Sequence, residues 1–200
     1  ISEEEIQTER SLKIDGKLRL KDISNYINSL RQLIPYWYDL YFPEQSDFSE
    51  NIKLWLSKLN RIGYAYFKPL TCVVLSKKDI NDNDKLRYLQ LTERWIFLLF
   101  RLSGYFETFR NSFYYNLSKD LYANKENLEY VLRELDNVPI LNESKTISID
   151  GPMSKISRLF KNNQGYYKWN TIRYFLYEYE LKLKGKTGTD IKLTPEAIFK

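Results

Sequence analysis

Histidine is missing from all 200 residues of this chain. It is the commonest general base near neutral pH and the commonest metal ligand in proteins. Its absence excludes a Ser-His-Asp triad, a Cys-His dyad, a zinc site and an HNH nuclease centre within these residues. No other group of residues in the sequence forms an enzyme site either, so we predict no catalytic residue, no metal site and no cofactor.

Cysteine is almost as scarce, because Cys72 is the single one in the chain. It cannot form an internal disulfide, and its setting in LTCVVL indicates a small buried hydrophobic residue. Without a disulfide framework, we expect a reducing, cytoplasmic compartment. The longest apolar run, Trp95–Phe100, is far shorter than the roughly 20 residues that span a bilayer, so no membrane partner is expected.

Alanine occurs only three times, against 17 Tyr and 11 Phe. We therefore expect a core of large rings, with many tyrosine hydroxyls near water or a polar partner. The length suits one domain. Because no initiator Met opens the chain, we expect a piece of a longer protein. It would be a single helical domain over 1–200, which can be subdivided into a bundle over 1–136 and C-terminal helices over 151–200.

Apolar residues recur at helical spacing along most of the chain, which predicts an all-α fold. We expect an irregular bundle of about seven to nine helices with no significant sheet. The first strong stripe predicts a main core helix of about five turns with a kink at Pro35. Its apolar residues are Ile23, Tyr26, Ile27, Leu30, Ile34, Trp37 and Tyr41.

The next predicted helix covers 52–62. Asp47 and Glu50 have the spacing of a capping box before it, and Gly63 is a plausible stop. The segment Pro69–Leu75 has the β-branched residues of a strand, but a proline in the first turn also suits a helix, which we prefer.

Four further helices are predicted before residue 165. The helix over Lys85–Leu102 contains WIFLLF, which is apolar on every side and should be buried. Helices over 113–121 and 128–135 follow, with Asn124 placed to cap between them. Pro152 suits the start of another helix.

The segment 165–181, GYYKWNTIRYFLYEYEL, is the densest aromatic stretch of the chain. Aromatic residues at helical spacing mostly fill protein interiors, so we expect a core helix that is covered on most sides and ends at Gly185. One stripe contains Trp169, Ile172, Leu176, Tyr179 and Leu183, and a second contains Tyr167, Tyr174, Tyr177 and Leu181.

Acidic residues suggest two sites that we do not favour. Asp79, Asn81 and Asn83 resemble the start of a calcium loop, but the required Gly and Glu are missing, so we expect a turn that caps the next helix. Glu93 and Glu107 lie among aromatic residues, where a structural ion pair with a neighbouring Arg is favoured over a catalytic acid.

The chain has a net charge of +5, and some of its cations are interleaved with aromatic residues. Surfaces that bind DNA combine phosphate contacts with base stacking in this way. The alternative, which such charge runs more often form, is an ordinary solvated helix face. The candidate DNA-contacting residues are Lys155, Arg158, Lys161, Lys168 and Arg173, with Arg101 and Arg110 as a second cluster.

Two segments, 89–122 and 166–181, resemble the central helical region of GmrSD-type modification-dependent restriction proteins. The shared features are a Glu-Arg pair before an aromatic residue, an Arg-rich turn, a Phe-Tyr helix and the aromatic helix. The signature residues are Trp95, Trp169, Ile172, Tyr174, Leu176 and Tyr179.

Members of that family carry a ParB-like nucleotide domain before this region and an HNH nuclease after it, and neither motif occurs here. The resemblance implies a non-catalytic module that connects and positions these flanking domains in a bacterial defence nuclease, with DNA as a further partner.

A second interpretation, from a different class, is a scaffold whose tyrosine-rich surface binds another protein or a second copy. An exposed apolar patch of several hundred Å² favours this scaffold, whereas a continuous basic groove favours DNA.

Overall fold

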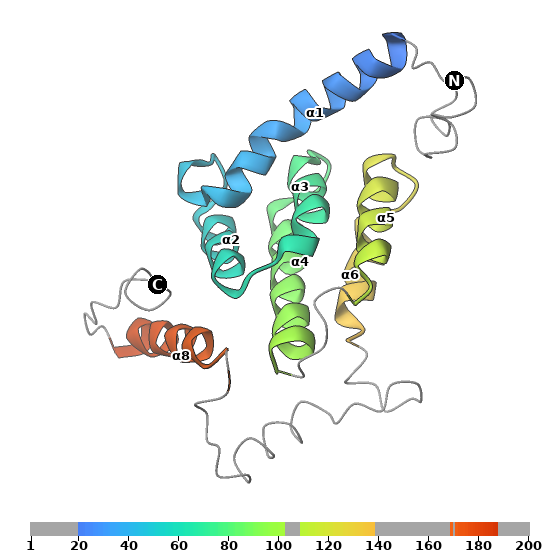
Figure 1. Cartoon of the computed structure of the whole chain (residues 1–200). Coiled ribbons are helices and arrows are strands. Elements are labelled where there is room, and N and C mark those ends of the chain that lie inside the picture. Colours follow the sequence, from blue (N-terminus) through green and yellow to red (C-terminus); the bar gives the residue numbers. More distant parts are fainter. Residues whose placement is uncertain (1–19, 103–108, 139–168, 170, 188–200) are drawn as a thin grey trace, which may run out of the picture.

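The computed structural model describes residues 20–102, 109–138, 169 and 171–187 (Figure 1). Within these ranges the chain forms seven α-helices and no strand, which confirms the predicted all-α fold. The helices are α1 Leu20–Tyr41, α2 Glu50–Ile62, α3 Lys68–Ser76, α4 Asp82–Trp95, α5 Asn111–Tyr122, α6 Leu128–Asp136 and α8 Ile172–Thr187.

Three short elements join these helices. Two are 3₁₀ turns, η1 over Pro43–Gln45 and η2 over Ala65–Phe67, and the third is the π-helix η3 over Ile96–Leu102, which continues α4. The expected helix that starts at Pro152 lies outside the described residues. No helix among those described has the length and apolar character needed to cross a bilayer.

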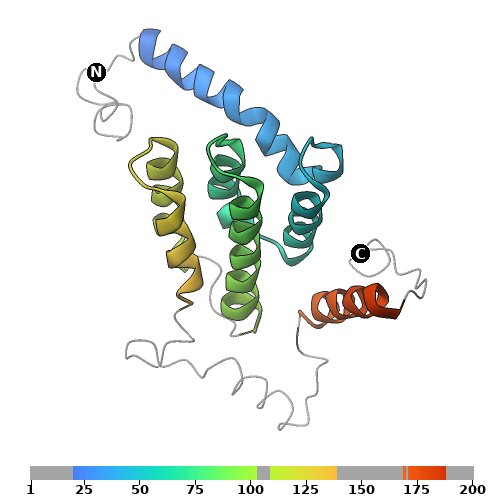
Figure 2. The same cartoon turned by 180° about the vertical axis from the view of Figure 1, so that it is seen from behind.

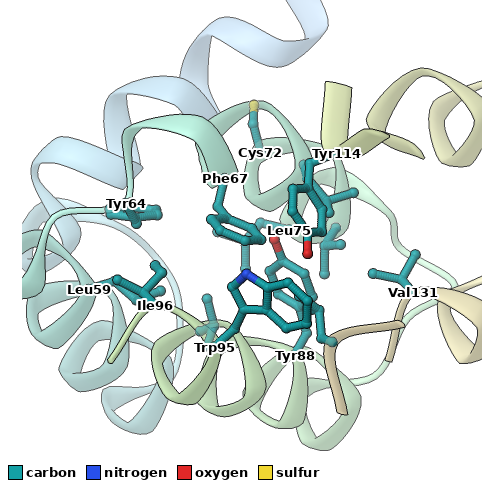
Figure 3. Packing of buried hydrophobic residues seen from close by; sticks show 14 of the residues in the cluster. Leu59, Tyr64, Phe67, Cys72, Leu75, Tyr88, Trp95, Ile96, Tyr114 and Val131 are labelled. Carbon is teal, nitrogen blue, oxygen red and sulfur yellow. The ribbon is translucent and has the colours of Figure 1, made fainter. Parts of the chain in front are cut away.

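The centre of the fold is the helix formed by α4 and η3. Its α4 part lies between α2 on one side and α6 on the other, and α3 and α5 form a second layer across these helices (Figures 1 and 2). Trp95 is fully buried there and meets Tyr114 edge to face, while Tyr114 packs against Phe67 at a ring distance of 4.5 Å (Figure 3). The predicted burial of WIFLLF is confirmed, with Phe97 and Leu98 only partly covered.

The segment with both strand and helix character is the helix α3, as preferred. Pro69 lies in its first turn, where a missing N–H costs no hydrogen bond. All residues of 70–75 are buried, including Cys72, whose burial raises the thiol pKa to about 12. Tertiary packing explains a helix of β-branched residues here, because the segment is enclosed on every side.

Two helix ends follow the prediction. Gly63 ends α2 with φ +81°, a conformation that favours glycine, and its N–H donates to the Leu59 carbonyl at 2.9 Å. Asn81 caps α4 by accepting a hydrogen bond of 3.0 Å from the Asp84 N–H, so the calcium-like segment is a capping turn.

Two predicted caps are wrong. The α2 helix starts at Glu50 behind Ser49 and has no side-chain cap, so the Asp47–Glu50 capping box does not form. Asn127, not Asn124, caps α6. Asn124 adopts φ 55° just after α5 and accepts a hydrogen bond from Lys77, so it belongs to the turn that ends α5.

The α1 helix has the predicted position but is not a main core helix. Only Leu33, Tyr36 and the fully buried Leu40 pack against the core. The predicted apolar stripe is exposed, and Ile34 at its middle has 62% of its surface open. The helix contacts α3, η1 and α2 through its C-terminal half, while its other end extends past the bundle (Figure 1).

The α8 helix is covered on one side and not on most sides as predicted. Tyr174 and Tyr177 of the second stripe are buried, whereas Leu176 and Tyr179 of the first stripe are exposed. The helix also continues through Gly185 to Thr187, so this glycine is not a stop.

We expect replacement of Leu56 by Ala to lower the free energy of unfolding by about 2–5 kcal/mol, because the side chain is fully buried on α2. Leu54→Ala is the matched control on the same helix, since Leu54 is 58% exposed and should change stability by less than about 0.5 kcal/mol. Denaturant unfolding measures both values, and equal losses would contradict the packing of α2.

Candidate functional site

Charged side chains from three helices meet where α8 joins the bundle. Lys58 and Arg61 come from α2, Glu93 from α4, and Tyr174 and Glu178 from α8; we call these five residues the charged junction. Each of its four charged side chains is only 14–21% exposed. Cations one turn apart on α2 therefore face carboxylates from two other helices in a partly buried setting.

The contacts in the charged junction form one network. The Nε and Nη2 atoms of Arg61 donate to Oε1 of Glu178 at 2.9 and 2.6 Å. Nζ of Lys58 lies 3.4 Å from Oε1 of Glu93 and 4.0 Å from Oε2 of Glu178. The Tyr174 hydroxyl donates to Glu93. The prediction that Glu93 forms an ion pair is confirmed, although its partner is Lys58 and not an Arg.

Burial and a neighbouring charge both raise the pKa of Tyr174. Burial in the junction raises the pKa of its hydroxyl well above the ordinary value, and the adjacent Glu93 carboxylate raises it further. A neutral hydroxyl can donate to the carboxylate, whereas a phenolate would repel it. Tyr174 is therefore a fixed hydrogen-bond donor and not a proton-transfer group near neutral pH.

A cluster of aromatic rings packs beside the charged junction. The Phe97 ring lies 6.4 Å from Trp169 and 6.2 Å from Tyr174, and the Trp169 ring lies 5.5 Å from Phe175. Nε1 of Trp169 donates to the Arg101 carbonyl at 3.3 Å. The two sequence segments that carry the family resemblance thus pack against each other.

Arg101 and Arg110, the second predicted DNA-contacting cluster, both have partners inside the protein. The Arg101 guanidinium donates twice to the Ile62 carbonyl, at 3.0 and 2.7 Å, and lies where a side chain on Gly63 would have to fit. Arg110 pairs with Glu134 at 3.1 Å and covers the Phe113 ring. These contacts give both residues a structural role.

The first predicted cluster is only partly described. Arg173 lies on the exposed side of α8, and Lys155, Arg158, Lys161 and Lys168 lie outside the described residues, as does Glu107. DNA contact by these residues stays a prediction. Of the signature residues, Trp95 and Tyr174 are buried, Trp169 and Ile172 are half-buried, and Leu176 and Tyr179 are exposed.

Among the described helices, α1 carries the longest run of exposed large apolar side chains. We call it the open stripe, and every member has 37–62% of its surface exposed. Tyr26, Tyr38 and Phe42 extend it and are also exposed. The members of the open stripe are Ile23, Ile27, Leu30, Ile34, Trp37 and Tyr41.

The sequence pattern predicts these residues to be buried in the core, whereas the structure exposes them. The helix has a second, shorter apolar row, Leu33, Tyr36 and Leu40, and this row is the one that packs on the core. The rows are roughly 100° apart around the helix, so a single neighbouring layer cannot cover both. The presence of two rows is the sequence signal that could have revealed the exposed one.

A small hollow lies beside Gly63 between η2 and η3. Its free volume is about 10 Å³, which is far below the range of roughly 300–1,000 Å³ that is typical of ligand sites. Its lining is largely apolar and includes Tyr64, Phe67, Ile96 and Phe100. We assign it no chemistry.

The raised pKa of Tyr174 predicts a loss of stability at high pH. Unfolded tyrosine loses its proton near pH 10, while the buried hydroxyl retains it. The native state then holds more protons, so each such group lowers the free energy of unfolding by up to about 1.4 kcal/mol per pH unit above pH 10.

Tyr174→Phe should therefore flatten the decline of stability measured by chemical unfolding at increasing pH. Tyr64, Tyr88 and Tyr114, whose pKa values burial also raises, leave a residual slope. Tyr179→Phe is the control, since Tyr179 is exposed on the same helix. Identical slopes for the two variants would contradict the assigned role.

No family model, no curated protein and no solved structure matches this chain. The resemblance to GmrSD-type restriction proteins therefore rests on the two sequence segments alone and stays a prediction.

Proposed function

We propose that this helical region is a protein-interaction module whose docking surface is the open stripe of α1. The observation that carries the proposal is a row of large apolar side chains, from Ile23 to Tyr41, that the rest of the described structure leaves uncovered. Water contact with such a row is unfavourable by about 25 cal/mol for each Å². A partner that covers it gains this free energy.

The size of the stripe supports docking. Its members present on the order of 500 Å² of apolar surface, and contiguous apolar patches of this size on a monomer often mark interaction sites. Single exposed hydrophobic residues are ordinary, and Leu54 and Tyr115 are examples here. The open stripe differs because its members follow one another along a helix.

The C-terminal part of the stripe is held in one geometry. Nζ of Lys68 lies 3.4 Å from the centre of the Tyr41 ring, and Trp37 contacts the same ring at 6.2 Å. The Tyr38 hydroxyl donates to Gln45 at 2.5 Å. A surface that is ordered before binding loses less conformational entropy when a partner arrives.

The double substitution Ile27→Ser with Ile34→Ser tests whether the stripe is a docking surface or a hidden part of the fold. Serine and isoleucine have similar helix propensities, so the helix itself is little affected. If the stripe serves intermolecular docking, the free energy of unfolding at low protein concentration should change by less than about 1 kcal/mol.

Leu40→Ser is the matched control on the buried side of the same helix and should lose at least about 2 kcal/mol. A comparable loss in the double variant would show that the chain itself covers the stripe, and would overturn the proposed function.

A second candidate function is the connecting and positioning module of a DNA-targeting defence nuclease of the GmrSD type. The favouring observation is the contact between the two signature segments, in which Trp169 and Tyr174 pack on Phe97. Ion pairs and aromatic packing set the direction of α8 when it lies on the bundle, and this direction would position a domain that follows in the chain.

The parent reading frame tests this candidate. We expect an HNH signature a short distance after Lys200 and a ParB-like motif upstream. A frame that encodes neither would contradict the positioning function and leave the interaction module unaffected.

A further inference from the structure

We propose that the open stripe of α1 binds the same stripe of a second copy of this chain, in a parallel two-stranded coiled coil. This inference rests on the proposed function and names the partner. The members of the stripe follow one another at alternating steps of four and three residues. That spacing is the heptad repeat of positions a and d, which keeps one seam facing a partner helix.

The residue types along the seam fit two parallel strands. The first two a positions are Ile27 and Ile34, with Tyr41 as the third, and Leu30 occupies the central d position. Isoleucine at a with leucine at d favours a parallel dimer. Pro35 follows the a position and so lies outside the seam.

The charges beside the seam also select the parallel orientation. The central position e holds Arg31, and the g position five residues earlier holds Tyr26; both are exposed, whereas the later g positions, Leu33 and Leu40, pack on the core of their own chain. In a parallel pair these positions face each other, so Arg31 lies against Tyr26 of the second copy in a cation–π contact. An antiparallel pair with full overlap would instead bring Arg31 close to Arg31 of the second copy.

The amount of surface fits a weak, reversible dimer. The α1 helix has 22 residues and is therefore about 33 Å long, and two stripes together present on the order of 1,000 Å². This value is near the lower limit for a specific interface, about 1,000 Å². The same surface on both copies also satisfies twofold symmetry, the commonest arrangement of homo-oligomers.

Sedimentation velocity of the full 200-residue chain tests the proposal. We expect a concentration-dependent change from monomer to dimer between the low and high micromolar range. Ile27→Ser with Ile34→Ser should weaken the dimer by a factor of at least about 100, since four buried isoleucines are removed per dimer. Leu54→Ser, which removes an exposed leucine on α2, is the control and should leave dimerisation unchanged.

Disulfide trapping tests the orientation. Leu30→Cys should form a covalent dimer on oxidation, because a d residue faces its own copy in a parallel pair. Asn28→Cys, exposed outside the seam, should not, and the native Cys72 is buried. An antiparallel pair would instead cross-link Leu30→Cys with Ile34→Cys. Arg31→Ala should weaken the parallel dimer about two- to fivefold.

A chain that stays monomeric at the highest concentration, or a dimer that is insensitive to the two serines, would overturn the second copy as partner. If the same double variant keeps its monomer stability, the stripe is still a surface open to another protein, and the proposed function stands. A destabilised monomer overturns the proposed function itself, so the two failures are distinguishable.

Discussion

The burial of α4 and η3 on several sides at once is the constraint on which the described structure depends. The helices α2, α3 and α6 pack on α4, and Tyr114 of α5 meets the fully buried Trp95. Glu93 and Phe97 attach α8 to the same helix. Close packing leaves little room for adjustment around a ring as large as Trp95. The positions of the surrounding helices are therefore coupled through one segment, and α1 lies one layer further out, on α3 and α2.

Periodicity in the sequence is enough to predict the helices but not their environment. The predicted burial of WIFLLF, residues 95–100, is confirmed because apolar residues surround the helix there and leave no exposed face to choose. On α1 two apolar rows compete, and periodicity alone cannot tell which of them meets the core. The row with Leu40 packs on the core because it faces α3. The position of α3 depends in turn on its contacts with α5, which is distant in the sequence. On α8, likewise, Tyr174 and not Leu176 faces the bundle.

The candidate site was predictable only in part, for a similar reason. An ion pair at Glu93 follows from the low chance that a carboxylate among aromatic residues stays unpaired. Its partners are Lys58, on a different helix, and Tyr174, 81 residues away in the sequence, and no local pattern indicates either of them. The arginines of the second cluster, Arg101 and Arg110, looked available for phosphate, yet a backbone carbonyl and Glu134 occupy them. The net positive charge of the chain is thus a poor guide to which cations face a partner.

The contacts that attach α8 are weaker than those that hold the bundle together, so separation of α8 and unfolding of the bundle require different free energies. Long side chains such as Arg61 and Glu178 hold it, together with the rings of Phe97 and Trp169, whereas the helices of the bundle interdigitate more closely. Separation of α8 therefore breaks the charged junction without opening the core around Trp95. Such a partial opening requires less free energy than global unfolding, so the amide hydrogens of α8 exchange with solvent faster than those of α4.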